Sequence, residues 1–161
     1  MKIVSNTTPL IALSSIDQLE LLPALFQTIY VVPSVVDECT AGGPITVPDP
    51  RQVGWCRVLE TFSRAPQPFL DQLDLGERHT IEAALAIQAD WVLMDERLGR
   101  NVAEHLGLKV TGTLGVLLKA KQVGLISSFV ACAREMRQRG IYFNTRLLAK
   151  LAVQVEEIWS S

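Results

Sequence analysis

The chain has 161 residues, a hydrophobic content of 48% and a formal net charge of −2. This composition excludes a disordered chain, and the length favours a single domain over residues 1–161 with a core of its own. Because no run approaches about 18 apolar residues and the polar segment SNTTP interrupts the opening of the chain, we expect neither a membrane span nor a signal peptide, and therefore a cytoplasmic protein.

Short apolar segments alternate with segments of helical periodicity along the chain. The predicted strands are 2–5, 29–32, 91–94 and 108–110, and 54–62 suits either a strand or a short helix. The predicted helices are 10–14, 19–26, 33–40, 77–88, 96–106, 113–123, 128–139 and 145–158. The predicted connections include 42–54 and 63–75. This order predicts an α/β fold, a three-layer α/β/α sandwich with a central parallel sheet and residues 125–161 as a C-terminal helical extension.

Asp95 directly follows the apolar run 91–94, at the predicted carboxyl end of a buried strand. Ligands of open α/β sheets bind outside this edge. Glu77 opens the preceding helix, which runs back about 18 Å at 1.5 Å per residue, and the strand returns about the same distance. We therefore expect Glu77 and Asp95 to be neighbours, with Glu77 on the inward stripe of its helix.

Two further polar residues are predicted at the same edge. Glu38 lies in the helix that Pro33 opens after the strand 29–32, and Asn6 follows the first strand. Clustered carboxylates repel one another unless a cation neutralises them. Ligands that are all oxygen atoms select hard cations, which predicts Mg²⁺ or Mn²⁺.

Each of these residues also has a purely structural interpretation. Asp95 could cap the N-terminus of the helix 96–106, and Glu77 could complement a helix dipole. Asn6 could satisfy backbone groups in a turn. The three scattered cysteines, Cys39, Cys56 and Cys132, lack the spacing of a zinc site or a disulfide framework, and we expect them to be small buried apolar residues.

Five segments together resemble the PIN-domain superfamily, closest to a bacterial branch related to VapC-type toxins. They are SNTTPLIAL, PSVVDE, GERHTIEAALA, VLMDER and VTGTLGVLLKAK. The resemblance covers the chain from Ile3 to about Glu157. It implies an Mg²⁺- or Mn²⁺-dependent endoribonuclease with four acids, of which Glu38, Glu77 and Asp95 match three. It further implies an RNA substrate, the toxin role of a toxin–antitoxin pair with an antitoxin partner, and a homodimer.

The fourth acid position of that family is Asn6 in this chain. An amide offers an oxygen ligand without a charge, so the predicted site loses one negative unit, which Glu96 could partly replace if its side chain turns inward. The alternative is a degenerate PIN-like domain that binds RNA or a protein without cleaving. A phosphatase-like hydrolase is a weaker alternative, because no DxDxT stretch is present.

Charge is unevenly distributed along the chain. Residues 1–95 contain 5 Lys/Arg and 12 Asp/Glu (−7), whereas residues 96–161 contain 10 and 5 (+5). An acidic part with candidate metal ligands, joined to a basic part, suits a site that binds cations and attracts phosphates. Arg97 and Arg100 follow Asp95 closely and are the predicted nucleic-acid contacts, although both could simply lie on a solvated helix face.

Overall fold

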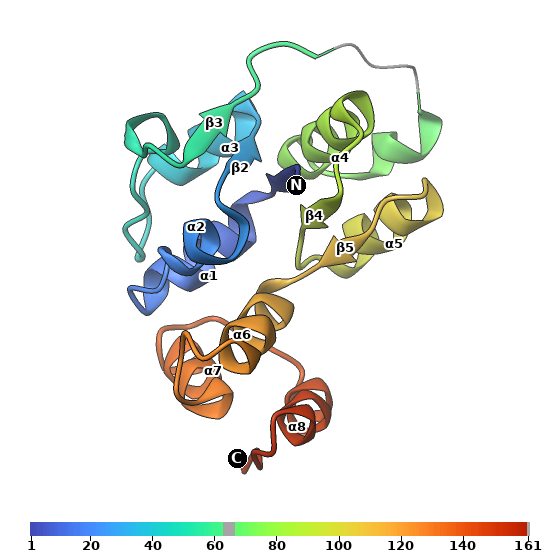
Figure 1. The fold of residues 1–161 in the computed structure, drawn as a ribbon. Coiled ribbons are helices and arrows are strands. Elements are labelled where there is room, and N and C mark those ends of the chain that lie inside the picture. The colour runs from blue at the N-terminus through green and yellow to red at the C-terminus, as the bar shows by residue number, and fades with distance from the viewer. Residues whose placement is uncertain (63–66, 161) are drawn as a thin grey trace.

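Five parallel strands form the centre of the computed structural model, which describes residues 1–62 and 67–160. The strands are β1 (Ile3–Ser5), β2 (Ile29–Val31), β3 (Cys56–Val58), β4 (Trp91–Leu93) and β5 (Val110–Thr111). Their order in the sheet is β3-β2-β1-β4-β5 (Figure 1). The N-terminal strand is therefore central, and all carboxyl ends lie at one edge.

The helices agree closely with the predicted ones. They are α1 (Thr7–Ser15), α2 (Leu21–Phe26), α3 (Pro33–Thr40), α4 (Leu75–Ile87), α5 (Arg97–His105), α6 (Thr113–Gln122), α7 (Phe129–Gln138) and α8 (Thr145–Gln154). Short 3₁₀ turns occupy Pro50–Gln52 (η1) and Pro68–Gln72 (η2). Within the described residues no helix has the length and apolarity needed to cross a bilayer.

Several boundaries differ from the prediction by one to four residues, among them the starts of α2 (Leu21 rather than 19) and α4 (Leu75 rather than 77). The first helix begins at Thr7 rather than after Thr8, and the last helix stops at Gln154 rather than continuing to 158. The segment 54–62, for which the sequence left strand or helix open, contains the edge strand β3. The fifth strand covers Val110–Thr111 rather than 108–110. Part of the predicted connection 63–75 lies outside the described residues, because these resume at residue 67.

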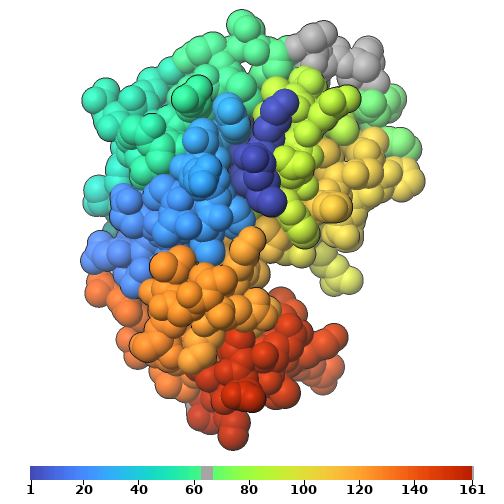
Figure 2. All heavy atoms as spheres, in the orientation of Figure 1, coloured from blue at the N-terminus to red at the C-terminus, as the bar shows by residue number. Residues whose placement is uncertain are grey.

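The two C-terminal helices extend the sandwich beyond the sheet. α7 packs against α6, and α8 packs against α7. The Glu157 carboxylate accepts hydrogen bonds from the backbone N–H groups of Phe129 and Val130 at the start of α7, at 2.9 and 3.0 Å, which holds the segment after α8. The surface is hollowed between α5 (yellow) and α8 (red) in Figure 2.

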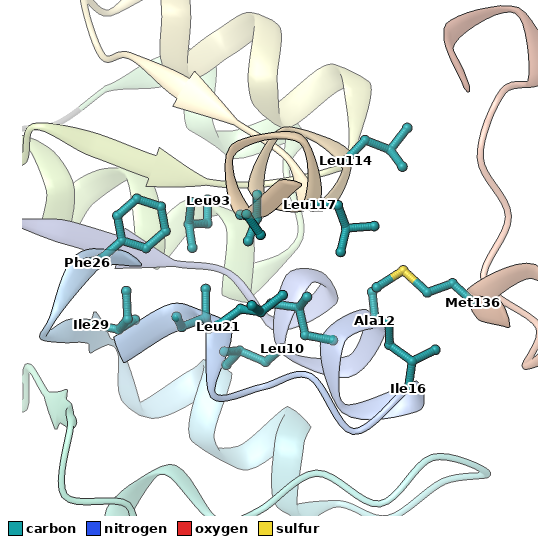
Figure 3. Packing of buried hydrophobic residues seen from close by; sticks show 14 of the residues in the cluster. Leu10, Ala12, Ile16, Leu21, Phe26, Ile29, Leu93, Leu114, Leu117 and Met136 are labelled. Carbon is teal, nitrogen blue, oxygen red and sulfur yellow. The ribbon is translucent and has the colours of Figure 1, made fainter. Parts of the chain in front are cut away.

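Side chains of alternate strand residues face opposite sides of the sheet, so two apolar cores form. Ile3, Ile29 and Leu93 pack against α1, α2 and α6 in the larger core (Figure 3). Their neighbours Val4 and Val92 pack against α4 and α5 on the other face. Helices cover both faces, which confirms the predicted α/β/α sandwich.

Candidate functional site

The carboxyl edge of the sheet brings Asn6 beside the end of β4. Ser5 pairs with Leu93 in the register of β1 and β4, and the Asn6 backbone N–H donates to the Leu93 carbonyl at 2.9 Å. Asp95 follows β4 at this edge. The loops after two adjacent strands thus place two of the four predicted residues on one side of the sheet.

Asn6 is buried at 5% exposure and stands at the N-cap position of α1, but its side chain makes no capping hydrogen bond. Its amide oxygen Oδ1 has no hydrogen-bond partner among the described residues, and the buried hydroxyl of Thr7 has none either. Buried polar atoms without partners are rare because they lose hydration without compensation. Asn6 therefore does not serve as the simple turn-satisfying residue of the structural interpretation.

Glu77 lies in the first turn of α4 and is 8% exposed, which confirms its predicted inward orientation. Asp74 accepts a hydrogen bond from the Glu77 backbone N–H at 2.9 Å and so caps the helix. Burial raises the pKa of the Glu77 carboxyl to about 7, and the carboxylates of Asp74 and Glu96 add to the shift. Glu96 thus acts electrostatically on Glu77, although its own side chain is exposed. The site holds an acid whose ionised form is disfavoured without a cation.

Two glycines allow carboxylates to lie against helix backbones. A Cβ atom at Gly76 would overlap Glu38 Oε1 and lie 3.1 Å from Glu38 Cδ, so Glu38 of α3 contacts the start of α4 beside Glu77. A Cβ atom at Gly112, directly before α6, would overlap Asp95 Oδ1. The sequence reasoning missed this role of both glycines. Their only signal was position, because Gly76 directly precedes Glu77 and Gly112 directly precedes the helix predicted at 113–123.

Asp95 does not cap α5, so that structural interpretation was wrong. Its Oδ1 accepts from the Thr113 backbone N–H at 2.7 Å, and its Oδ2 accepts from the Thr113 hydroxyl at 2.5 Å. Burial raises the Asp95 pKa, while these bonds and the charge of Arg100 oppose the rise. Asp95 instead caps α6, because the end of β4 lies beside the end of β5, directly before that helix.

The four predicted residues thus lie at separate points around the edge. Glu38 contacts Gly76, the residue before Glu77, at the start of α4. Asn6 lies beside the end of β4, and Asp95 is hydrogen-bonded to the start of α6. Across residues 1–62 and 67–160, no three Asp, Glu, His or Cys side chains are placed to hold one ion. The donors nevertheless suit a hard cation chemically, because carboxylate, amide and hydroxyl oxygens surround the edge and the Asn6 oxygen is unpartnered.

A hollow of about 520 Å³, here called the α5–α8 hollow, opens beside Asp95 between α5, α6, the segment 141–144 and α8. Arg97 and Arg100, the predicted nucleic-acid contacts, line it. Arg100 also donates to the Met94 carbonyl at 3.5 Å, which ties its guanidinium to the end of β4. The two arginines place positive charge next to the acidic edge, where a phosphate would meet it.

Comparison with known families agrees with this geometry. A family model described as a PIN domain matches residues 2–157, which is nearly the whole chain. Comparisons with curated proteins and with solved structures give no match.

Proposed function

The chain belongs to the PIN-domain family, whose fold is of the nuclease type, and from that premise we propose that it is an Mg²⁺- or Mn²⁺-dependent endoribonuclease. The observation that carries this proposal is the buried Asn6 oxygen without a partner, at the same edge as Asp95. Glu77 supports it, because its pKa of about 7 marks a carboxylate that a cation would stabilise.

In this proposal Asn6, Glu38, Glu77 and Asp95 would supply the oxygen ligands, for which their side chains must move closer together around the ion, and Glu96 would add negative charge. A divalent cation bound there would supply an activated water and would stabilise negative charge on the phosphate. The buried hydroxyl and backbone N–H of Thr113 orient Asp95.

The walls of the α5–α8 hollow supply the complementary charge. Arg97 and Arg100 bind the RNA phosphates beside Asp95, so the anionic backbone lies along the acidic edge rather than being repelled by it.

Family resemblance further supports a toxin of a toxin–antitoxin pair, with an antitoxin protein as partner and a homodimer as the assembly. Growth arrest on expression, relieved by co-expression of a neighbouring gene product, is the expected outcome. Growth that continues despite expression of a soluble, RNA-cleaving protein would refute the toxin role and leave the nuclease.

A second candidate is a PIN-like domain that binds RNA or a protein without cleavage. Two observations favour it: Asn6 replaces the acid of the family pattern, and both Asp95 oxygens are already hydrogen-bonded to Thr113. An aspartate held in this way is less available as a ligand.

Calorimetric titration with Mn²⁺ and Mg²⁺, paired with cleavage of a fluorescent single-stranded RNA, separates the two candidates. We expect Asp95→Asn to lose metal affinity and to cleave at least about 100-fold more slowly, because removing a group that stabilises transition-state charge costs about that much. Glu104→Gln removes an exposed carboxylate of α5 and is the control, expected to behave as wild type. A folded wild type that neither binds metal nor cleaves RNA would establish the binding module instead.

A further inference from the structure

The α5–α8 hollow has an apolar wall that phosphate binding alone does not explain. The wall comes from the segment between α7 and α8 and from α8 itself. Its residues are Ile141, Tyr142, Phe143, Leu147 and Leu151. The opposite wall carries Arg97 and Arg100, and the hollow reaches Asp95. One side is thus apolar and aromatic, and the other is cationic.

The size of the hollow limits what it can hold. About 520 Å³ lies within the range of pockets for small organic groups. Double-stranded RNA is recognised from outside, across its minor groove, and does not enter such a space. An unpaired nucleotide does, because its base can be splayed from the strand and stacked on an aromatic ring.

Tyr142 provides an aromatic surface that is both exposed and held in place. It is 74% exposed, and the Arg137 guanidinium lies over its ring at 5.9 Å from the centroid. The segment is anchored at both ends, since the Ile141 N–H donates to the Met136 carbonyl at 3.0 Å and Asn144 caps α8. A large exposed ring that is already ordered loses little entropy when a base stacks on it.

We propose that the α5–α8 hollow is a nucleotide pocket that holds one unstacked base of single-stranded RNA against Tyr142. The flanking phosphates lie toward Arg97 and Arg100, so the pocket sets a base preference next to Asp95. This inference deepens the proposed nuclease function and rests on it. Arg97 and Arg100 favour an anionic occupant, and the exposed Tyr142 ring that lines the same hollow suits the base of a nucleotide.

A double-mutant cycle with an abasic nucleotide tests the pocket. Fluorescence anisotropy measures the affinity of the protein for short single-stranded oligonucleotides in EDTA, with one abasic position moved along the strand. For wild type we expect one position where base removal weakens binding about five- to 150-fold, the range of base–aromatic stacking. In Tyr142→Ala the intact and abasic strands should bind equally, whereas Tyr142→Phe should retain the difference.

Phe69→Ala is the matched control, because Phe69 is another exposed ring (53%) outside the hollow, and it should behave as wild type. If wild type binds intact and abasic strands equally well, the nucleotide pocket is refuted. It is also refuted if Tyr142→Ala still loses as much affinity as wild type when the base is removed. In either case a protein segment would be the better occupant of the hollow. Cleavage in Mn²⁺ is scored separately: base-dependent binding without cleavage would refute the nuclease and keep the pocket.

Discussion

Glu77 is a buried acid and Asp95 a partly buried one near the same sheet edge, and their surroundings differ. Burial raises the pKa of both carboxyls. Around Asp95, two hydrogen bonds from Thr113 and the charge of Arg100 oppose that rise. Around Glu77, the carboxylates of Asp74 and Glu96 add to it.

The two environments differ in how far they stabilise a negative charge. The donors of Thr113 and the charge of Arg100 partly offset the desolvation of Asp95, whereas the carboxylates beside Glu77 make its ionised form still less favourable. We infer that a bound cation would stabilise ionised Glu77 more than ionised Asp95. Three variants test this difference.

Glu77→Gln should have the largest effect on stability. In metal-free buffer the folded protein keeps the Glu77 proton between pH 4.5 and about 7, whereas the unfolded chain releases it. The free energy of unfolding of wild type therefore falls as pH rises through this window, by about 3 kcal/mol. In Glu77→Gln the free energy of unfolding should not fall in this window, so the variant should be more stable than wild type at pH 8. Urea denaturation at pH 4.5 and pH 8 measures the free energy of unfolding, and Glu104→Gln is the control. If that free energy changes between the two pH values by the same amount in wild type and in Glu77→Gln, Glu77 is not the group responsible.

Thr113→Val should have an intermediate effect. It keeps the shape of the buried side chain but removes the hydroxyl that donates to Asp95 Oδ2 at 2.5 Å. Losing a hydrogen bond to a charged group costs about 2 kcal/mol of folding free energy. Thr113→Ser retains the hydroxyl and should lose less. If thermal denaturation shows both variants equally stable, Asp95 does not depend on this donor.

Asn6→Asp should have the smallest effect, and it acts on metal binding. The added carboxylate brings one more negative charge to the edge, and we expect Mn²⁺ affinity to rise about tenfold, or about 1.4 kcal/mol. Gln122→Glu adds the same charge at the exposed C-terminal end of α6, outside the hollow, and should change affinity little. An affinity unchanged by Asn6→Asp means that the amide oxygen already suffices.

Local chemistry predicted most of the fold. Pro33 at the first turn of α3, the apolar run that became β4 and the cap Asn144 each depend on neighbours within a few residues. The edge strand β3 stayed open because its exposed Arg57 leaves no clear alternation. The C-terminal end of α8 was overestimated because Val155 and Ile158 continue a helical apolar pattern that the chain does not follow.

The site was predictable in part. Helical periodicity placed Glu77 inward, and it is buried. The partner of Asp95 was not predictable, because Thr113 lies 18 residues later and meets it only through the pairing of β4 with β5. Contacts such as that of Glu38 with Gly76 likewise depend on how two helices pack, which spacing along the chain does not encode.

The central position of β1 affects the order of assembly on the ribosome. β1 pairs with β2 early, but its other neighbour β4 is synthesised about 60 residues later, which takes about 3–12 s at 5–20 residues per second. During that interval the nascent sheet has an open side, and neither Glu77 nor Asp95 has joined it. The acidic edge therefore cannot form until synthesis has passed β4, because Asp95 directly follows that strand.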